Sequence, residues 1–316
     1  MRRAVVTGPT GEIGLALVEE LIRNDIEVIA VVRPGSGRIK RLPKSDKLRL
    51  VENELDKLED LPKLITEKYD VFYHLAWDFS RDHDNVEKQY KNIGYTLDAV
   101  KAAAAIGCDT FVGAGSQAEY GIVNGVIAPE TPAFPVMAYG MAKLCAGQLS
   151  RKLAAQLNMK HIWPRIISVY GPGDAESTMI ISLIRKLLAG EKPSLTKGEQ
   201  LWDFLYSKDC AWAMRLVGEM GKDGAVYCIG SGKKQPLRAF IETIRDEIDP
   251  KLPLGIGEVP YRENQVMELD IDISSLVEDT GFSPEYSFEQ GIRETIEWCR
   301  NNGAVLKQEE AENSLS

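Results

Sequence analysis

The sequence predicts an α/β protein with a parallel sheet covered by helices on both faces, followed by a smaller lobe. In the first half of the chain, short and almost continuously apolar runs alternate with helical stretches, a pattern typical of a doubly wound parallel sheet. After Gly171 the elements become shorter and more mixed. A chain of 316 residues is long enough for one large α/β domain or two closely fused lobes.

The individual elements follow from the apolar runs and from apolar residues at helical spacing. We expect strands at 4–8, 27–33, 48–53, 71–76, 110–116 and 161–171. We expect helices at 15–24, 85–106 and 138–157. Pro172, Gly173 and Asp174 then mark a turn. The predicted domains are a sheet domain over 1–171, to which some later segments return, a lobe mainly over 172–306, and a disordered polar tail at 307–316.

Composition narrows the class of protein. A net charge of −9 argues against a nucleic-acid partner, which needs a clustered basic face. No run reaches 18 apolar residues and no secretory leader pattern is present, so we expect a cytoplasmic protein without a membrane partner. The five cysteines form no CxxC pair and only three histidines accompany them. We therefore expect reduced thiols and no metal site.

The stretch "VVTGPTGEIG" at 5–14 places three glycines between the first expected strand and the first expected helix. In a dinucleotide-binding loop, one such glycine makes the tight turn, one lets a pyrophosphate approach the backbone, and one lets helix and strand pack closely. The start of the helix supplies free N–H groups for the phosphates. Gly8, Gly11 and Gly14 could serve these three purposes, or they could form an ordinary strand-to-helix turn.

A second motif, "YGMAK" at 139–143, places Tyr139 and Lys143 four residues apart. On a helix this spacing puts them on one face. A neighbouring ammonium stabilises a phenolate and is expected to lower the pKa of Tyr139 from its usual value near 10. Ser116 ends the fifth expected strand, where it could hydrogen-bond a substrate oxygen beside that phenol. The alternatives are an exposed Tyr and Lys on an ordinary helix, and a serine that only caps a turn.

Together these motifs resemble the extended short-chain dehydrogenase/reductase superfamily, in particular its NAD-dependent epimerase/dehydratase family. Matching segments extend over nearly the whole chain: TGxxGxxG at 7–14, "YHLAW" at 73–77, "NIGYT" at 92–96, YxxxK at 139–143, "PRIISVYGPGD" at 164–174, "WDFLYSKD" at 202–209, "YCIGSG" at 227–232 and "TGFSPEYSFEQGIRETIEW" at 280–298. The last two match the family's C-terminal lobe. The resemblance implies a Rossmann-type sheet, a C-terminal substrate-binding lobe and an enzyme that acts on nucleotide-diphosphate sugars.

The resemblance also implies roles for individual residues. Tyr139 would be the general acid/base, Lys143 would orient the cofactor ribose and tune the tyrosine, and Ser116 would hold the reacting oxygen. Cofactor contacts are expected from Gly8, Thr10, Gly11, Glu12, Ile13, Arg33, Leu75, Ala76, Tyr139, Lys143, Arg165 and Ile167. Substrate contacts are expected from Trp77, Ser116, Gln117, Tyr139 and Arg262.

The end of the second strand favours NADP(H) over NAD(H). NAD enzymes of this type usually carry an acidic residue there that accepts from the ribose hydroxyls. This chain reads "AVVRPGSGR", with no acid and with Arg33 at the strand end. A guanidinium suits a 2′-phosphate; the alternative is that the basic residues form a solvated loop.

The residues around Ser116 restrict the reaction. The family's 4,6-dehydratases carry an Asp–Glu pair where this chain has Gln117 and Ala118, and its 3,5-epimerising reductases carry a cysteine in place of Ala118 and a histidine in place of Gly173. None of the residues present can move a proton. We therefore expect NADP(H)-dependent reduction of a 4-keto, 6-deoxy nucleotide sugar. The alternatives are a C4 epimerase that retains its cofactor and a non-catalytic member that senses NADP(H).

Two further expectations concern the substrate and the assembly. Many relatives have an arginine that grips the substrate diphosphate where this chain has Trp202, and Arg262 matches a second arginine with the same role. The helices at 85–106 and 138–157 resemble those that pair in family dimers, so we expect a homodimer.

Overall fold

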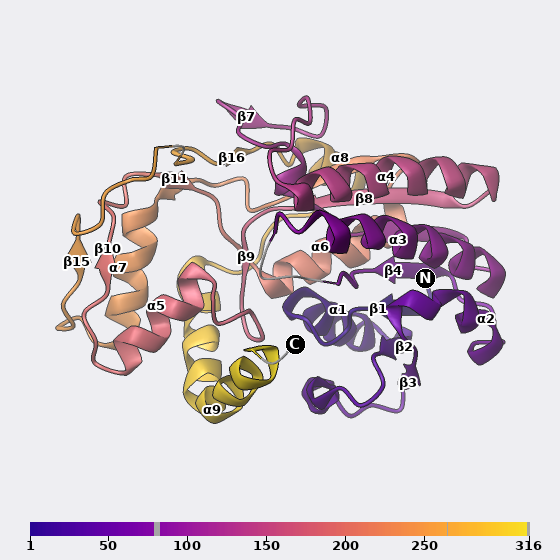
Figure 1. The fold of residues 1–316 in the computed structure, drawn as a ribbon, viewed down its shortest axis with the longest axis horizontal. Helices are drawn as coiled ribbons and strands as arrows, with labels where there is room; N and C mark the ends of the chain where they lie inside the picture. The colour runs from indigo at the N-terminus through magenta and orange to yellow at the C-terminus, as the bar shows by residue number, and fades with distance from the viewer. Residues whose placement is uncertain (79–82, 264, 315–316) are drawn as a thin grey trace.

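The computed structural model describes residues 1–78, 83–263 and 265–314 (Figure 1). Its centre is an eight-stranded parallel sheet in the order β13-β8-β5-β4-β1-β2-β3, with the short strand β6 also paired to β8. Its strands are β1 (Arg3–Thr7), β2 (Glu27–Val32), β3 (Leu48–Glu52), β4 (Val71–His74), β5 (Thr110–Gly113), β6 (Gly115–Ser116), β8 (Lys160–Ile166) and β13 (Val226–Ile229). The predicted Rossmann-type sheet is thereby confirmed.

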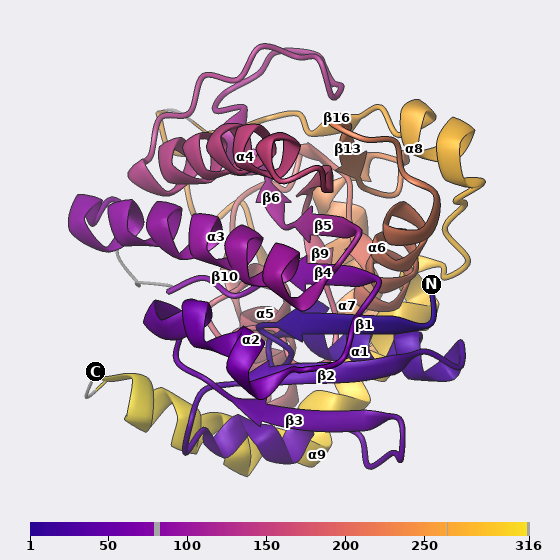
Figure 2. The ribbon, with the colours of Figure 1, turned by 90° about the vertical axis from the view of Figure 1, so that its right-hand side faces the viewer.

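Helices cover both faces of this sheet because its central strands are apolar on both sides. Val6 and Tyr73 belong to a core formed with α1 (Glu12–Arg23) and α6 (Ser207–Met220), on the face where α8 (Ser274–Thr280) also packs. Val5 and Phe72, their neighbours in β1 and β4, point to the opposite face. That face is covered by α2 (Leu61–Leu64), α3 (Val86–Ile106) and α4 (Ala138–Gln156). Figure 2 shows α3 and α4 side by side along it.

A second, smaller lobe packs around its own apolar core beside the sheet (Figure 1). Its helices are α5 (Met179–Leu188), α7 (Leu237–Ile248) and α9 (Phe288–Ser314). Four two-stranded pairings complete the fold: β9 (Val169–Tyr170) with β12 (Leu205–Tyr206), β10 (Ser194–Leu195) with β15 (Gly255–Ile256), β11 (Leu201–Trp202) with β14 (Gln235–Pro236), and β7 (Val126–Ile127) with β16 (Asp270–Ile271). Short 3-10 helices lie at η1 (Gly37–Arg41), η2 (Leu55–Asp60) and η3 (Gln117–Glu119).

The structure corrects several expectations. The strand predicted at 161–171 is interrupted: β8 ends at Ile166, Ser168 has a φ of 34°, and β9 leaves the sheet to pair with β12. The "YCIGSG" segment, whose match was to the C-terminal lobe, instead supplies β13 of the main sheet. The tail predicted to be disordered from 307 continues α9 through Ser314, in keeping with the helix-forming Lys, Glu and Ala of its sequence. Among the described residues, no helix has the length and apolarity needed to cross a bilayer.

Candidate active site

The glycine loop between β1 and α1 has the shape that the sequence predicts. Gly8 has a φ of +72°, and a side chain there would place its Cβ 2.7 Å from the backbone nitrogen of Ala76. A Cβ on Gly14 would lie 2.1 Å from the Gly8 carbonyl oxygen, so helix and loop can pack this closely only without one. A Cβ on Gly11 would meet only that same oxygen, at 3.7 Å. The backbone at Gly11 is therefore open to an approaching group.

Helix α1 begins at Glu12, three residues earlier than the sequence suggests, with Gly11 as its N-cap. The first N–H groups of a helix have no partner within it, and the dipole makes this end positive. Thr10 and Ile13 lie half-buried on either side of the helix start. This end of α1 thus offers N–H donors for a dinucleotide diphosphate.

The loop after β4 lies against this helix start because Thr7 and His74 fix it. Leu75 N–H donates to the Thr7 carbonyl at 3.2 Å, and Ala76 N–H donates to Thr7 Oγ1 at 3.3 Å. His74 Nδ1 lies 2.9 Å from the same hydroxyl. Burial lowers the pKa of His74 to about 3, so the ring is neutral and serves structure rather than proton transfer.

The three predicted catalytic residues come together at the carboxyl end of the sheet. Ser116 ends β6, and its side chain lies close enough to the phenol of Tyr139, in the first turn of α4, to stabilise the phenolate. Lys143, one turn further along α4, is buried and donates from Nζ to the Ala114 carbonyl at 2.8 Å. Ser116 also caps η3 by accepting from Ala118 N–H at 3.2 Å. The serine therefore caps a turn, and its contact with a substrate oxygen stays a prediction.

Trp77, a predicted substrate residue, contacts both of the predicted catalytic side chains of α4. Its ring meets the Tyr139 ring edge-on, with centroids 6.0 Å apart, and lies 3.8 Å from Lys143 Nζ. Gln89 of α3 fixes the indole by accepting from its Nε1 at 3.0 Å. A cation–π contact of this kind stabilises the charged lysine in a buried place.

The pKa of Tyr139 differs from the value expected from the sequence. The pKa of Tyr139 is raised above its usual value because burial disfavours the phenolate more than the Ser116 hydrogen bond stabilises it. The expected lowering by Lys143 is therefore wrong for this structure. The lysine ammonium is directed at Ala114 and Trp77, with Nζ 5.9 Å from the Tyr139 ring centroid. Burial lowers the pKa of Lys143 to about 7, which brings its proton into the working range of an enzyme.

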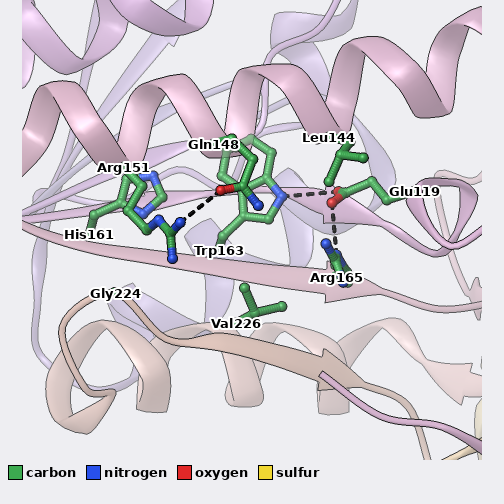
Figure 3. Close-up of a pocket in the computed structure, with 10 residues that line it drawn as sticks. Glu119, Leu144, Gln148, Arg151, His161, Trp163, Arg165, Gly224 and Val226 are labelled. Atoms are coloured by element: carbon green, nitrogen blue, oxygen red, sulfur yellow. Dashed lines mark hydrogen bonds and ion pairs between the residues drawn. The ribbon is translucent and has the colours of Figure 1, made fainter. Parts of the chain in front are cut away.

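Glu119 supports this site from behind. Ser116 and Glu119 have the S-x-x-E spacing of a capping box, a signal that our sequence analysis did not use. Its Oε1 accepts from Ser116 N–H at 2.8 Å and from Trp163 Nε1 at 3.0 Å, and its Oε2 accepts from Arg165 Nε at 2.7 Å. Figure 3 shows the carboxylate between Trp163 and Arg165, beneath the helix that carries Leu144 and Gln148. The cavity beside it measures only about 10 Å³, room for about one water molecule. This interior cluster is therefore a support for Ser116 and not a ligand site.

The start of α4 is also held from outside the helix. Asp84 Oδ1 accepts from Ala138 N–H at 2.9 Å, and the His83 carbonyl accepts from Tyr139 N–H at 3.0 Å. The His83 ring stands edge-on to the phenol, with centroids 5.6 Å apart. An acidic residue some fifty positions upstream of a helix has no local signature, so sequence reasoning missed this cap.

A larger cavity, of about 260 Å³, is lined by residues of β9, β11, α5 and α7 and of neighbouring loops. Its described lining residues include Trp202, Gln200, Asp174 and Ser168, and none of them is Lys or Arg. Trp202 Nε1 donates to Ser168 Oγ at 2.9 Å, and this hydroxyl donates to Gln117 Oε1 at 3.4 Å. Ser168 thus connects the cavity to the residue that follows Ser116.

The remaining predicted residues lie in different environments. Arg33 is exposed at the carboxyl end of β2, the strand next to β1 and its glycine loop. Arg165 is buried in the ion pair with Glu119, and Ile167 is buried, with its N–H donating to the Ile229 carbonyl. Arg262 is exposed in the lobe; its carbonyl accepts from the N–H of Gln265, which lines the cavity. The cofactor and substrate contacts of these four stay predictions.

Comparison with known proteins decides the family. The model of the NAD dependent epimerase/dehydratase family matches residues 4–230. The chain belongs to this family. CDP-abequose synthase of Salmonella muenchen is 23% identical, covering 93% of this chain and 97% of that protein. The structure of UDP-N-acetylglucosamine 4-epimerase from Methanobrevibacter ruminantium M1, in complex with UDP-N-acetylmuramic acid, aligns with a TM-score of 0.85 at 25% identity over 95% of this chain and 99% of that one.

A further solved structure bears on the cofactor. MoeE5 in complex with UDP-glucose and NAD aligns with a TM-score of 0.80 at 26% identity, covering 95% of this chain and 99% of that one. The sequence-based assignment to the extended short-chain dehydrogenase/reductases is confirmed, as is the prediction of an NAD(P)-dependent enzyme of the nucleotide-sugar type. The glycine loop fits a nicotinamide dinucleotide, because Gly11 is open where a pyrophosphate would approach and the helix start supplies its donors.

Proposed function

We propose that this protein reduces a 4-keto nucleotide-diphosphate sugar with NADP(H), and that Tyr139 delivers the proton to the reduced oxygen. The observation that carries this is that Ser116, Tyr139 and the buried Lys143 lie together at the carboxyl end of the sheet, with Lys143 one helical turn from Tyr139. When bound, the cofactor supplies the hydride. The chain's own part is to hold the ketone oxygen with Ser116 and to protonate it from Tyr139.

The neighbourhood of Ser116 favours plain reduction over dehydration. Gln117 contributes a neutral amide whose oxygen accepts from Ser168, and Ala118 contributes only its backbone N–H to the turn. Neither can remove a proton from carbon. A phenol with a raised pKa is a proton donor at neutral pH, which suits the direction of ketone reduction.

The size and lining of the larger cavity favour a substrate that places one ring inside the protein and its phosphates outside. A space of about 260 Å³ lies below the range of about 300–1,000 Å³ typical of pockets for drug-sized ligands. Since no Lys or Arg is among its described lining residues, we place the diphosphate outside the cavity. Arg262, exposed on the adjoining loop, is the cation we assign to it.

A C4 epimerase is the second candidate, and the alignment with UDP-N-acetylglucosamine 4-epimerase favours it.

The purified protein should be tested with NADPH and the 4-keto-6-deoxyglucose derivatives of dTDP, CDP, UDP and GDP. A reductase oxidises NADPH with each turnover. An epimerase instead interconverts UDP-glucose and UDP-galactose without net cofactor consumption. No turnover with either set would point to the non-catalytic, NADP(H)-sensing alternative and contradict the proposal.

Arg33 should set the preference for NADP(H). We expect Arg33→Ala to raise the KM for NADPH by roughly 10- to 100-fold, because a charge-assisted contact with the 2′-phosphate contributes roughly 1.5–3 kcal/mol. The KM for NADH should hardly change, since NADH lacks this phosphate. Steady-state kinetics with both cofactors measures the ratio. Equal effects on NADPH and NADH would contradict the role of Arg33.

We also propose a homodimer formed through α3 and α4. Tyr90 and Leu149 are 71% and 46% exposed on these neighbouring helices, and exposed apolar groups on paired helices favour association. The double change Tyr90→Glu and Leu149→Glu should give a monomer mass by light scattering at micromolar concentration. Leu50→Glu is the control, because Leu50 is 44% exposed on β3. A wild-type monomer would refute the dimer.

A further inference from the structure

The start of helix α1 carries a half-buried acid with one enclosed carboxyl oxygen. Glu12 is the first residue of α1, yet its Oε1 is buried and no hydrogen-bond donor among the described residues reaches it. The same oxygen would lie 3.4 Å from a Cβ on Gly171, so the side chain points toward the turn after β9. A buried carboxylate without donors is costly. Its environment must therefore supply a proton or a partner.

The partner is a second carboxyl group. Asp174, in the turn after β9, is hydrogen-bonded to Glu12. Asp174 Oδ1 also accepts from Ala175 N–H at 2.6 Å and Oδ2 accepts from Thr178 Oγ1 at 2.8 Å. Ionised carboxylates only accept hydrogen bonds, so a bond between two of them requires one proton. Because Asp174 already receives two donors, the proton resides on Glu12.

The surroundings favour this neutral form. Burial and then Asp174 raise the pKa of Glu12 well above its usual value, and burial raises the pKa of Asp174 to about 6. On α6, burial raises the pKa of the Cys210 thiol, and interaction with Glu12 raises it further, so this thiol is neutral. The charged groups on the other adjoining elements have partners of their own. Arg41 of η1 contacts the Gly173 carbonyl and the Trp298 ring, and Glu176 pairs with Arg185 of α5. Asp209 of α6 accepts from the N–H groups of Glu285 and Tyr286.

We propose that Glu12 and Asp174 share one proton and that this proton is required for tight binding of the cofactor diphosphate at the start of α1. The first turn of a helix attracts anions through its free N–H groups and the helix dipole. An ionised Glu12 in the first turn would place a negative charge beside the diphosphate, and a protonated Glu12 does not. The inference requires only the nicotinamide dinucleotide that the family binds, and it is independent of the proposed reductase activity.

The direction of the pH dependence follows from this arrangement. The diphosphate binds the protonated pair better, so binding takes up a proton wherever the free pair has lost it. The Kd should therefore rise with pH once the free pair begins to ionise, by up to about tenfold per pH unit for one linked proton. Below that range the Kd should be constant.

The test compares the Kd for NADPH in wild type and Glu12→Gln, from the change in nicotinamide fluorescence between about pH 6 and pH 9.5. Glutamine keeps the size of the side chain and a hydrogen atom to donate to Asp174, but it does not ionise. We expect equal Kd values at pH 6 and a rise with pH in wild type that Glu12→Gln lacks. Lys143, whose pKa is lowered to about 7, titrates in both proteins, so the difference between the two curves isolates Glu12.

Two more variants test whether the pH dependence comes from this pair of carboxyl groups. Asp174→Asn removes the neighbouring negative charge, so Glu12 should ionise more readily and the loss of affinity should begin at lower pH than in wild type. Glu27→Gln is the control: it changes an exposed acid that pairs with Arg3 at the start of β2, and it should keep the wild-type curve. Curves of equal slope for wild type and Glu12→Gln would overturn the proposal.

A second measurement covers the case in which Glu12→Gln fails to fold. Infrared spectra of the wild-type protein without cofactor, taken at neutral and alkaline pH, report the protonated carboxyl stretch directly. In wild type we expect a buried carboxylic acid band at pH 7 that disappears at alkaline pH. At the pH where half of this band remains in wild type, we expect it to be missing from Asp174→Asn. Absence of that band in wild type at pH 7 would mean that the pair holds no proton and would refute the inference.

Discussion

Replacing Tyr139 with phenylalanine should reduce turnover on the order of 10²–10⁴-fold while leaving NADP(H) affinity close to that of wild type. General acid–base catalysis typically contributes this much, and the change removes the proton while keeping a ring that packs against Trp77 and His83. The glycine loop and Lys143 remain to bind the cofactor. Initial rates and a fluorescence titration with NADPH measure the two quantities separately.

Tyr69→Phe is the matched control, because this tyrosine lies just before β4, beside Arg3 at the opposite edge of the sheet. It should leave turnover unchanged. Ser116→Ala should also lower turnover without weakening NADP(H) binding, since it removes the partner of the phenol. Near wild-type turnover in Tyr139→Phe, with the fold intact by circular dichroism, would place the chemistry on another residue.

Replacing Glu119 with alanine should lower the free energy of unfolding by about 3–5 kcal/mol, the usual cost of leaving one member of a buried ion pair without its partner. Arg165 then stays charged but loses Glu119 as its ion-pair partner. The change also removes the hydrogen-bond acceptor of Ser116 N–H and Trp163 Nε1. Turnover should fall as well, because the backbone that carries the Ser116 hydroxyl loses its anchor. Denaturant unfolding measures the first effect and initial rates the second.

Two comparisons show whether the loss comes from the buried charge. Glu119→Leu combined with Arg165→Met removes both charges and should recover much of the stability. Glu67→Ala breaks the exposed pair with Arg49 and should have little effect on unfolding, because solvent screens such pairs. If Glu119→Ala unfolds at the same denaturant concentration as wild type, the buried pair does not hold the site together.

The sequence by itself determined the sheet and indicated the residues that we propose as catalytic, because both depend on local patterns. Apolar runs mark parallel strands that are buried on both faces, and β1, β2, β4 and β5 appear close to their expected positions. Glycine spacing identifies the cofactor loop, since only glycine fits the positive φ of Gly8 and the close approach at Gly14. Tyr139 and Lys143 are one helical turn apart, so their common face follows from spacing alone.

The tertiary structure decided the contacts between residues far apart in the chain. Glu119 meets Arg165, 46 positions away, because β6 and η3 pack against β8. Glu12 meets Asp174 because the chain leaves the sheet at Ser168 and turns back over the start of α1. The raised pKa of Tyr139 also depends on three-dimensional burial. A sequence pattern specifies which side chains share an element, whereas the dielectric around a charge and the identity of its partner depend on how the elements pack.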